Sequence, residues 1–109
     1  MLEYSINGEK MHIELGHILM IESFDHKVEI TTVEKRKIVF YNKIGHLEKQ
    51  LKERGFVRIH KSYLVNLKYV TDIKYDEVVL MKDTKAIKLP FGRKYRTKLS
   101  RNADFGGLR

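Results

Sequence analysis

The sequence predicts a mainly β domain with one amphipathic helix, and three features of the chain predict it. Apolar and polar residues alternate in short runs through much of the 109 residues, which is typical of strands with one buried face. The dipeptide Asn7-Gly8 separates two of these runs and suits a tight hairpin turn. Between residues 42 and 55 the apolar spacing changes from two to three and four, which is the spacing of a helix.

The first part of the chain predicts two β-hairpins with a further strand between them. These strands are expected at residues 3–6 with 10–15, at 18–21, and at 28–32 with 38–41. The run at 18–21 is wholly apolar and short, so we expect a strand buried on both faces. The basic residues 35–37 are expected to form an exposed hairpin tip.

One amphipathic helix is expected to follow the second hairpin. Asn42 can cap its start and Gly55 is a natural stop. Ile44, Leu47 and Leu51 lie three and four residues apart, so they form a single apolar stripe. A helix with one apolar face is expected to pack on the sheet.

Strands are expected to resume after the helix. Their positions are residues 56–59, 68–75, 77–82 and 85–89. Asn66 is expected to be a turn residue, because asparagine tolerates left-handed conformations. A basic stretch without a predicted element begins at Phe91. We expect residues 1–109 to form a single domain with a core at about 3–99 and a frayed tail at 100–109.

Composition restricts the class of protein. The chain has no cysteine, which excludes disulfides and thiolate chemistry, and we expect a cytoplasmic location. No apolar run has the length of a membrane span, so no membrane partner is expected. The net charge is +8, and residues 82–109 carry nine Lys and Arg against two acids. This one-sided excess of positive charge predicts a polyanionic partner, although a solvated tail would have the same composition.

The sequence offers no arrangement of residues that favours catalysis. None of its five histidines pairs with another at the helical i, i+4 spacing of a metal site. The acids are scattered, and no glycine-rich loop leads from a strand into a helix to bind a nucleotide. We therefore expect no metal, no cofactor and no enzymatic activity.

Three segments concentrate hydrogen-bond donors at turns or strand ends. They are residues 23–27, 58–62 and 92–96. Arginine and lysine there can donate to guanine edges or to phosphate, and histidine can donate to a base edge. Other interpretations stay open, because His60 would equally suit a core position satisfied by backbone groups. Arg93 and Lys94 would equally suit solvent.

The segment Phe56-Val57-Arg58-Ile59-His60-Lys61-Ser62-Tyr63-Leu64-Val65-Asn66 resembles the central motif of the LytTR-type DNA-binding domain, the output module of many bacterial response regulators. Further pieces of that pattern occur in order on both sides, including Asp25-His26-Lys27-Val28 and Leu89-Pro90-Phe91-Gly92-Arg93-Lys94-Tyr95. The resemblance covers roughly residues 3–99. It departs from the common pattern at Lys61, where members often carry Asn or Arg, and at Gly92, where many carry a polar residue.

The resemblance implies an elongated β-sheet domain that binds double-stranded DNA in bacterial transcription regulation, through loops that enter successive major grooves at direct-repeat sites. It places His26, Lys61 and Arg93 at the base contacts. It implies phosphate contacts for Lys27, Ser62, Lys94 and Arg96. The partners it implies are DNA, a second copy of the chain on the DNA, and a receiver domain or sensor kinase upstream in a two-component system. The sequence begins directly at the binding domain, so an excised output domain and a stand-alone regulator are both expected possibilities.

Three other functions stay open at this point. A basic β domain that binds RNA or another polyanion by charge alone would show little sequence preference. A protein–protein adaptor would expose residues 78–81 on a sheet edge. A small enzyme would have to lose turnover when a histidine is replaced.

Overall fold

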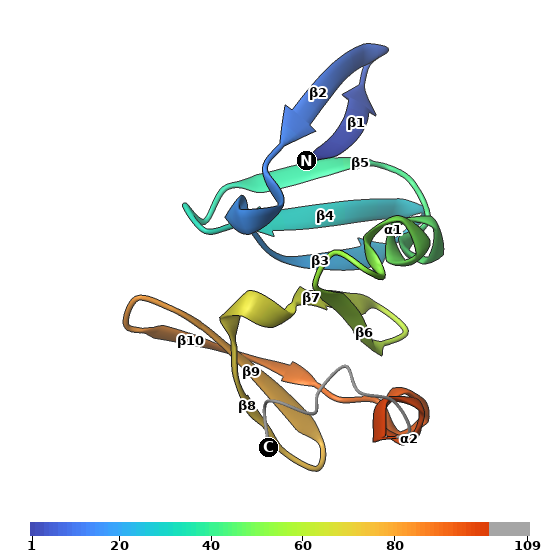
Figure 1. Ribbon diagram of the computed structural model, residues 1–109. Coiled ribbons are helices and arrows are strands. Elements are labelled where there is room, and N and C mark those ends of the chain that lie inside the picture. The colour runs from blue at the N-terminus through green and yellow to red at the C-terminus, as the bar shows by residue number, and fades with distance from the viewer. Residues whose placement is uncertain (101–109) are drawn as a thin grey trace.

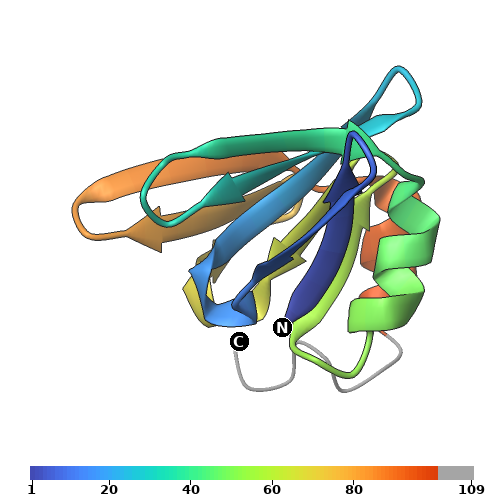
Figure 2. The same ribbon diagram turned by 90° about the horizontal axis from the view of Figure 1, so that it is seen from above.

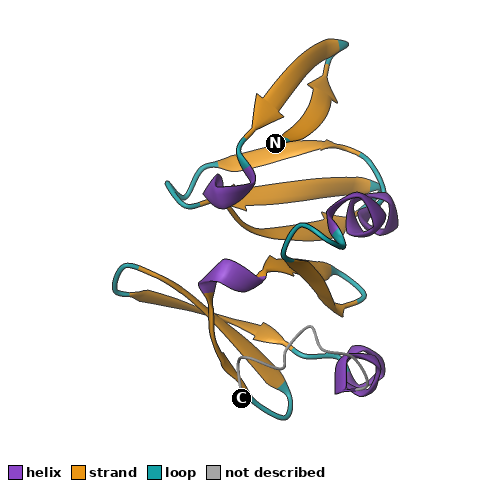
Figure 3. Ribbon diagram, in the orientation of Figure 1, coloured by secondary structure: helices purple, strands orange, loops and turns teal. Residues whose placement is uncertain are grey.

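A computed structural model describes residues 1–100 and confirms the mainly β architecture (Figure 1). The strands are β1 (Leu2–Ile6), β2 (Glu9–Ile13), β3 (Ile18–Phe24), β4 (Lys27–Thr32), β5 (Lys37–Tyr41), β6 (Phe56–His60), β7 (Tyr63–Asn66), β8 (Val70–Ile73), β9 (Glu77–Lys82) and β10 (Lys85–Pro90). The α-helices are α1 (Ile44–Leu51) and α2 (Arg93–Ser100), and short 3-10 turns span Leu15–His17 and Leu67–Tyr69 (Figure 3). The predicted frayed tail covers residues 100–109. Ser100 is the last residue of α2, and residues 101–109 lie outside the described part of the chain.

The strands form three antiparallel sheets. A central sheet has the order β5-β4-β3-β7-β6, a second has the order β10-β9-β8, and β1 pairs with β2. The molecule is elongated, with extents of 41 × 29 × 24 Å. In Figure 1 the β1–β2 hairpin lies at the top, the central sheet in the middle and the β8–β10 sheet at the bottom.

Two apolar clusters hold these layers together on opposite faces of the central sheet. The first packs α1 and the β1–β2 hairpin on one face, with Ile21, Ile30 and Leu64 from the sheet. The second packs the β8–β10 sheet on the other face, with Ile59 and Val65. Because side chains alternate between the faces of a strand, neighbouring residues of β7 enter different clusters.

The predicted amphipathic helix is confirmed, with a correction at each end. Ile44, Leu47 and Leu51 are buried. The helix ends at Leu51 with its cap at Lys52, so the predicted stop at Gly55 was too late, and Gly55 with its left-handed φ of 89° belongs to the turn before β6. The cap position at its start is Lys43, and its side chain makes no capping bond. Asn42 instead accepts a hydrogen bond from the adjacent Lys43 N–H at 2.7 Å, so the predicted cap was wrong by one residue.

Two further expectations need correction in the second half. The strand predicted at residues 68–75 is shorter, because a 3-10 turn precedes β8. Asn66 has an extended φ of −84° and is buried, so it is not a left-handed turn residue. Its side-chain amide donates to the carbonyls of Leu15 and Ile18 at 3.2 and 2.9 Å, which ties β7 to the start of β3.

The sequence analysis missed the second helix, α2. This helix carries no acid in its first turn and no apolar stripe like that of α1. It follows Gly92, whose carbonyl accepts the first helical hydrogen bond from the Arg96 N–H at 2.8 Å. The described residues therefore contain two α-helices rather than the single one expected.

Candidate nucleic-acid interface

Three donor-rich segments come together along one edge of the molecule. The Ser23 N–H donates to the Ser62 carbonyl at 2.9 Å, which joins the β3–β4 hairpin to the β6–β7 turn. The Gly92 N–H donates to the Ile59 carbonyl at 2.8 Å, which joins β6 to the start of α2. We call residues 25–27, 61–62 and 93–96 the donor edge. Seen from above, the β3–β4 turn projects on the same side of the molecule as α1 and α2 (Figure 2).

The β3–β4 turn presents His26 at the first position of the donor edge. Asp25 and His26 have φ angles of 47° and 64°, so both central residues are left-handed, as in a two-residue type I′ turn. His26 is exposed. Lys27 is half-buried, and its Nζ lies 5.4 Å from the centre of the Tyr41 ring. Phe24 and Lys27 pair on either side of this turn, so His26 is presented from a two-residue loop between paired strands.

The β6–β7 turn presents Lys61 at the second position. Lys61 is exposed, and Ser62 is half-buried. The Ser62 N–H donates to Nδ1 of His60 at 3.1 Å, and the His60 and Tyr63 ring centres are 5.4 Å apart. The interpretation of His60 as a histidine satisfied by backbone is thus supported, although His60 is half-buried at the turn and is not in the core.

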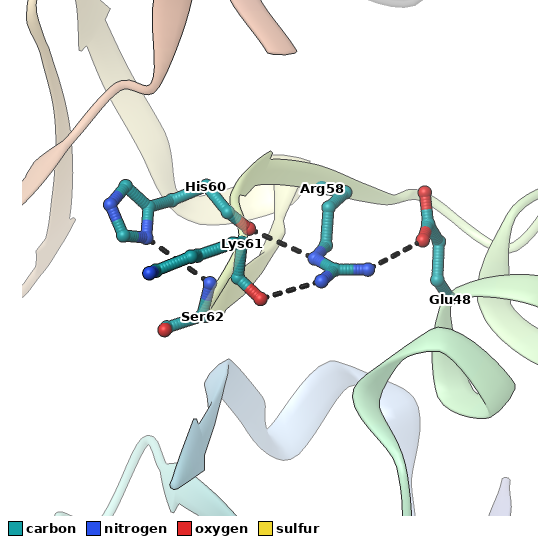
Figure 4. A network of polar contacts seen from close by, with 5 residues as sticks. All are labelled: Glu48, Arg58, His60, Lys61 and Ser62. Carbon is teal, nitrogen blue, oxygen red and sulfur yellow. Dashed lines mark hydrogen bonds and ion pairs between the residues drawn. The ribbon is translucent and has the colours of Figure 1, made fainter. Parts of the chain in front are cut away.

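Arg58 does not belong with the exposed donors, which corrects the grouping of residues 58–62. Its side chain is 14% exposed, and its Nη1 lies 2.8 Å from a Glu48 carboxylate oxygen on α1. Its Nε donates to the His60 carbonyl at 2.9 Å, and its Nη2 donates to the Lys61 carbonyl at 2.5 Å. Figure 4 shows this guanidinium between Glu48 and the turn. Arg58 therefore uses its donors inside the protein.

Helix α2 presents Arg93 at the third position. Arg93 and Lys94 are exposed. Arg96 is half-buried, its guanidinium lies 3.8 Å from the centre of the Tyr75 ring, and its Nη1 donates to the Tyr75 carbonyl at 2.6 Å. Arg96 thus fastens α2 to the β8–β9 turn, and only its remaining N–H groups can serve a phosphate.

Gly92 leaves room for the Tyr95 ring at the start of α2. A Cβ atom at this position would lie 3.2 Å from Cδ2 of Tyr95 and 3.7 Å from Cα of His60. The first distance is tighter than usual, so the Tyr95 ring would have to shift, whereas the second is an ordinary van der Waals contact. The departure from the family pattern at Gly92 therefore goes with the placement of Tyr95 in the donor edge.

A carboxylate lies behind the β6–β7 turn, next to a tyrosine hydroxyl. The Tyr63 hydroxyl donates to the Glu22 carboxylate at 3.4 Å. Burial, the negative charge of Glu22 and this hydrogen bond all raise the pKa of Tyr63 above its usual value. Tyr63 is thus neutral at neutral pH and supports the turn without adding charge to it.

Other kinds of site find little support in the described residues. No group of three or more His, Cys, Asp or Glu in residues 1–100 is placed to hold a metal ion. A hollow of about 220 Å³ near the β1–β2 turn contains Ser5, but its lining includes no histidine or acid that could activate the hydroxyl. No helix in this part of the chain is long and apolar enough to cross a membrane. The adaptor interpretation requires residues 78–81 to be exposed on a sheet edge. Val78, Val79 and Leu80 are buried in the middle strand of a sheet, and Met81 is exposed.

The sequence analysis found the three segments but missed two residues that support them. Glu48 on α1 and Tyr95 on α2 both contact Arg58, the side chain that donates to the β6–β7 turn. Glu48 lies one position after the apolar Leu47, and nothing in its spacing shows which partner it meets. The alternation of Phe56, Arg58 and His60 was a usable signal, since it places Arg58 on the face of β6 that the helix covers.

Comparisons with known proteins agree with this description. The family model for the LytTr DNA-binding domain matches residues 8–103. The chain is 25% identical over 91 residues to the sensory transduction protein LytT of Bacillus anthracis, covering 82% of this chain and 37% of that protein. A solved structure, the LytTr DNA-binding domain of a putative methyl-accepting/DNA response regulator from Bacillus cereus, matches with a TM-score of 0.71 and 16% identity, over 92% of this chain and 93% of that one.

Proposed function

This chain belongs to the LytTR family of DNA-binding domains, and we propose that it recognises specific double-stranded sequences through its donor edge. Membership of the family supports DNA binding in transcription regulation. We assign base contacts to His26, Lys61 and Arg93. The observation that carries the assignment is that these three side chains are exposed on one edge, on segments joined by backbone hydrogen bonds. Phosphate contacts are assigned to Lys27, Ser62, Lys94 and Arg96.

The donor edge is long enough to reach more than one major groove of DNA. The two turns are two strand spacings apart in the order β4-β3-β7-β6, or about 10 Å. Helix α2 lies beyond β6, and a helix with its side chains adds about 10 Å. The row is thus about 20 Å long, against a major-groove width of about 12 Å. A row of this length supports contacts to successive grooves across one phosphate backbone.

The first turn of α2 is suited to an anion. Arg93, Lys94 and Arg96 place positive charge beside the positive end of the helix dipole, which is unfavourable for an isolated helix. A bound phosphate would reverse this, because it interacts favourably with both the basic side chains and the free N–H groups at a helix start. Phosphate binding would thus account for basic side chains in the first turn of α2 that lower the stability of the free protein.

The biological assembly belongs to the same proposal. We propose two copies on direct repeats about one helical turn apart, with a receiver domain or sensor kinase acting upstream. The chain spans 37% of the length of the Bacillus anthracis relative, so further parts of such a regulator are outside the sequence described. We also propose that residues 1–109 behave as one domain.

The proposal is tested by selecting binding sites from random duplex DNA at physiological salt, with excess non-specific competitor. We expect enrichment of a short motif that recurs about one helical turn apart. The rival function is charge-driven binding to RNA or another polyanion. Retention of duplexes with no enriched sequence, together with equal affinity for RNA of the same length, would favour that rival.

A further inference from the structure

We propose that Arg58, held by Glu48, is a positioning residue that fixes the direction of Lys61 and does not itself contact DNA. The inference rests on the proposed function, because it explains how one contact of the donor edge is held in place. Its basis is the set of hydrogen bonds between the guanidinium and the β6–β7 turn (Figure 4).

The guanidinium holds both peptide groups that flank Lys61. The His60 carbonyl belongs to the peptide before Lys61, and the Lys61 carbonyl belongs to the peptide after it. Arg58 donates to these two oxygens at 2.9 and 2.5 Å. When both flanking peptides are fixed, φ and ψ of the residue between them are fixed, and so is the direction of its Cα–Cβ bond. Arg58 thereby sets where the Lys61 side chain leaves the turn.

Glu48 holds the guanidinium in the orientation that this requires. Its carboxylate lies 2.8 Å from Nη1, and the two side chains are 14% and 29% exposed. Glu48 is itself placed firmly, because its neighbour Leu47 and the later Leu51 are buried under α1. A planar guanidinium donates in fixed directions, so one anchored side orients the others.

The same guanidinium also contacts the third segment of the donor edge. Its central carbon lies 5.5 Å from the centre of the Tyr95 ring on α2, two residues after Arg93. A cation beside an aromatic ring at this distance is attracted to it. One side chain therefore contacts α1, the turn that presents Lys61 and the helix that presents Arg93.

A DNA contact by Arg58 conflicts with these observations. Turning the guanidinium outward would leave the partly buried hydrogen bonds to the His60 carbonyl and the Glu48 carboxylate unmade, which is costly, and would also release the exposed Lys61 carbonyl. The positive charge of Arg58 is also paired with Glu48, so it adds little to the neutralisation of phosphates. Salt dependence can therefore separate a positioning role from a phosphate contact.

The test compares Arg58→Lys and Glu48→Gln with the wild type on the selected duplex and on random duplex, over a range of salt. Lysine keeps the charge but cannot reach both carbonyls and the carboxylate together. We expect Arg58→Lys to lose about tenfold in affinity for the selected duplex, with unchanged affinity for random duplex and an unchanged salt slope. Glu48→Gln should also lose affinity for the selected duplex, by a smaller factor than Arg58→Lys.

The matched control is Glu29→Gln, which removes an ion pair of 3.4 Å with Lys37 away from the donor edge. It should leave the affinities for both duplexes unchanged. A third variant, Arg58→Gln, removes the charge, and a fall of about one in its salt slope would overturn the inference in favour of a phosphate contact. Equal losses on both duplexes would also overturn it, because they would show a general loss of structure.

A second measurement decides the inference even if the wild type selects no sequence and the proposed function fails. Backbone 15N relaxation of the free protein should show Lys61 and Ser62 as rigid as the strands in the wild type and more mobile in Glu48→Gln. Equal rigidity of the turn in both proteins would refute the positioning role without reference to DNA.

Discussion

Arg93 and Lys94 are adjacent and both exposed, yet they differ in what their side chains can recognise. The planar fork of arginine matches the O6 and N7 atoms of guanine, while lysine is a point charge suited to phosphate. We expect Arg93→Ala to cost roughly 1–3 kcal/mol on the selected duplex and to relax preference at one base pair. Lys94→Ala should weaken binding to all duplexes and lower the salt slope by about one.

Each variant is the control for the other, because both remove one positive charge from the first turn of α2. Binding titrations on selected and random duplex, repeated at several salt concentrations, separate the two effects. Equal losses on both duplexes for Arg93→Ala would remove Arg93 from the base contacts.

The raised pKa of Tyr63 makes the stability of the fold depend on pH in the alkaline range. Burial and the Glu22 carboxylate raise its pKa in the folded state. The folded protein therefore holds this proton more tightly than the unfolded chain. The resulting stability is fully present below the usual tyrosine pKa of about 10 and is lost as pH rises through the raised pKa.

We expect Tyr63→Phe to lose stability less steeply than the wild type as pH rises above the usual tyrosine pKa of about 10. Urea unfolding at a series of pH values measures this slope. Glu22→Gln should lower the pKa of Tyr63 only in part, because burial remains. Identical slopes for Tyr63→Phe and wild type would show that other tyrosines or lysines control the alkaline transition.

At the scale of elements, the two α-helices differ in whether the local sequence pattern predicts them. Helix α1 was predicted because Ile44, Leu47 and Leu51 repeat at the helical period and are buried together. Helix α2 was missed because contacts distant in sequence hold it, including the bond from Arg96 to Tyr75. Its basic first turn also opposes the rule that acids favour a helix start. Local patterns therefore predicted one helix and gave no sign of the other.

The apolar stripe of α1 predicts the cost of removing its central residue. Leu47 is 1% exposed, so Leu47→Ala leaves a cavity between α1 and the central sheet. We expect a loss of about 2–5 kcal/mol in the free energy of unfolding, measured by urea denaturation. The control is Gln50→Ala on the exposed face of the same helix, which should change stability by less than about 0.5 kcal/mol. A similar change in both variants would contradict the packing of α1 on the sheet.

At the scale of the whole molecule, the residues of the core were predictable but the way the sheets join was not. Alternation marked Val57 and Ile59 as buried, and both are. The order β5-β4-β3-β7-β6 depends on pairings such as Ile21 with Leu64, which are 43 positions apart and leave no local pattern. The donor edge likewise depends on contacts between segments that are far apart in the sequence. Its three segments were visible in the sequence, but their adjacency comes from β3 pairing with β7 and from Gly92 bonding to β6.

The end of the molecule opposite the donor edge brings two basic hairpin tips together. The β4–β5 and β9–β10 turns lie at the far ends of their strands, on the same side of the molecule (Figures 1 and 2), and Lys35 of the first turn interacts with Lys85 at the second. A hydrogen bond with Lys85, burial and the repulsion between the two charges lower the pKa of Lys35, while Asp83 partly opposes them. A lowered lysine pKa means that the folded state disfavours the charged form, so this contact opposes folding at neutral pH.

We therefore expect Lys85→Glu to raise the thermal unfolding midpoint at low salt, because it replaces a repulsion with an attraction to Lys35. The control is Lys88→Glu, which makes the same change of charge at another exposed position of β10. The advantage of Lys85→Glu over this control should shrink as salt increases, since screening weakens charge interactions at an exposed site. Equal midpoints for the two variants at low salt would show that the two hairpin tips do not interact in solution.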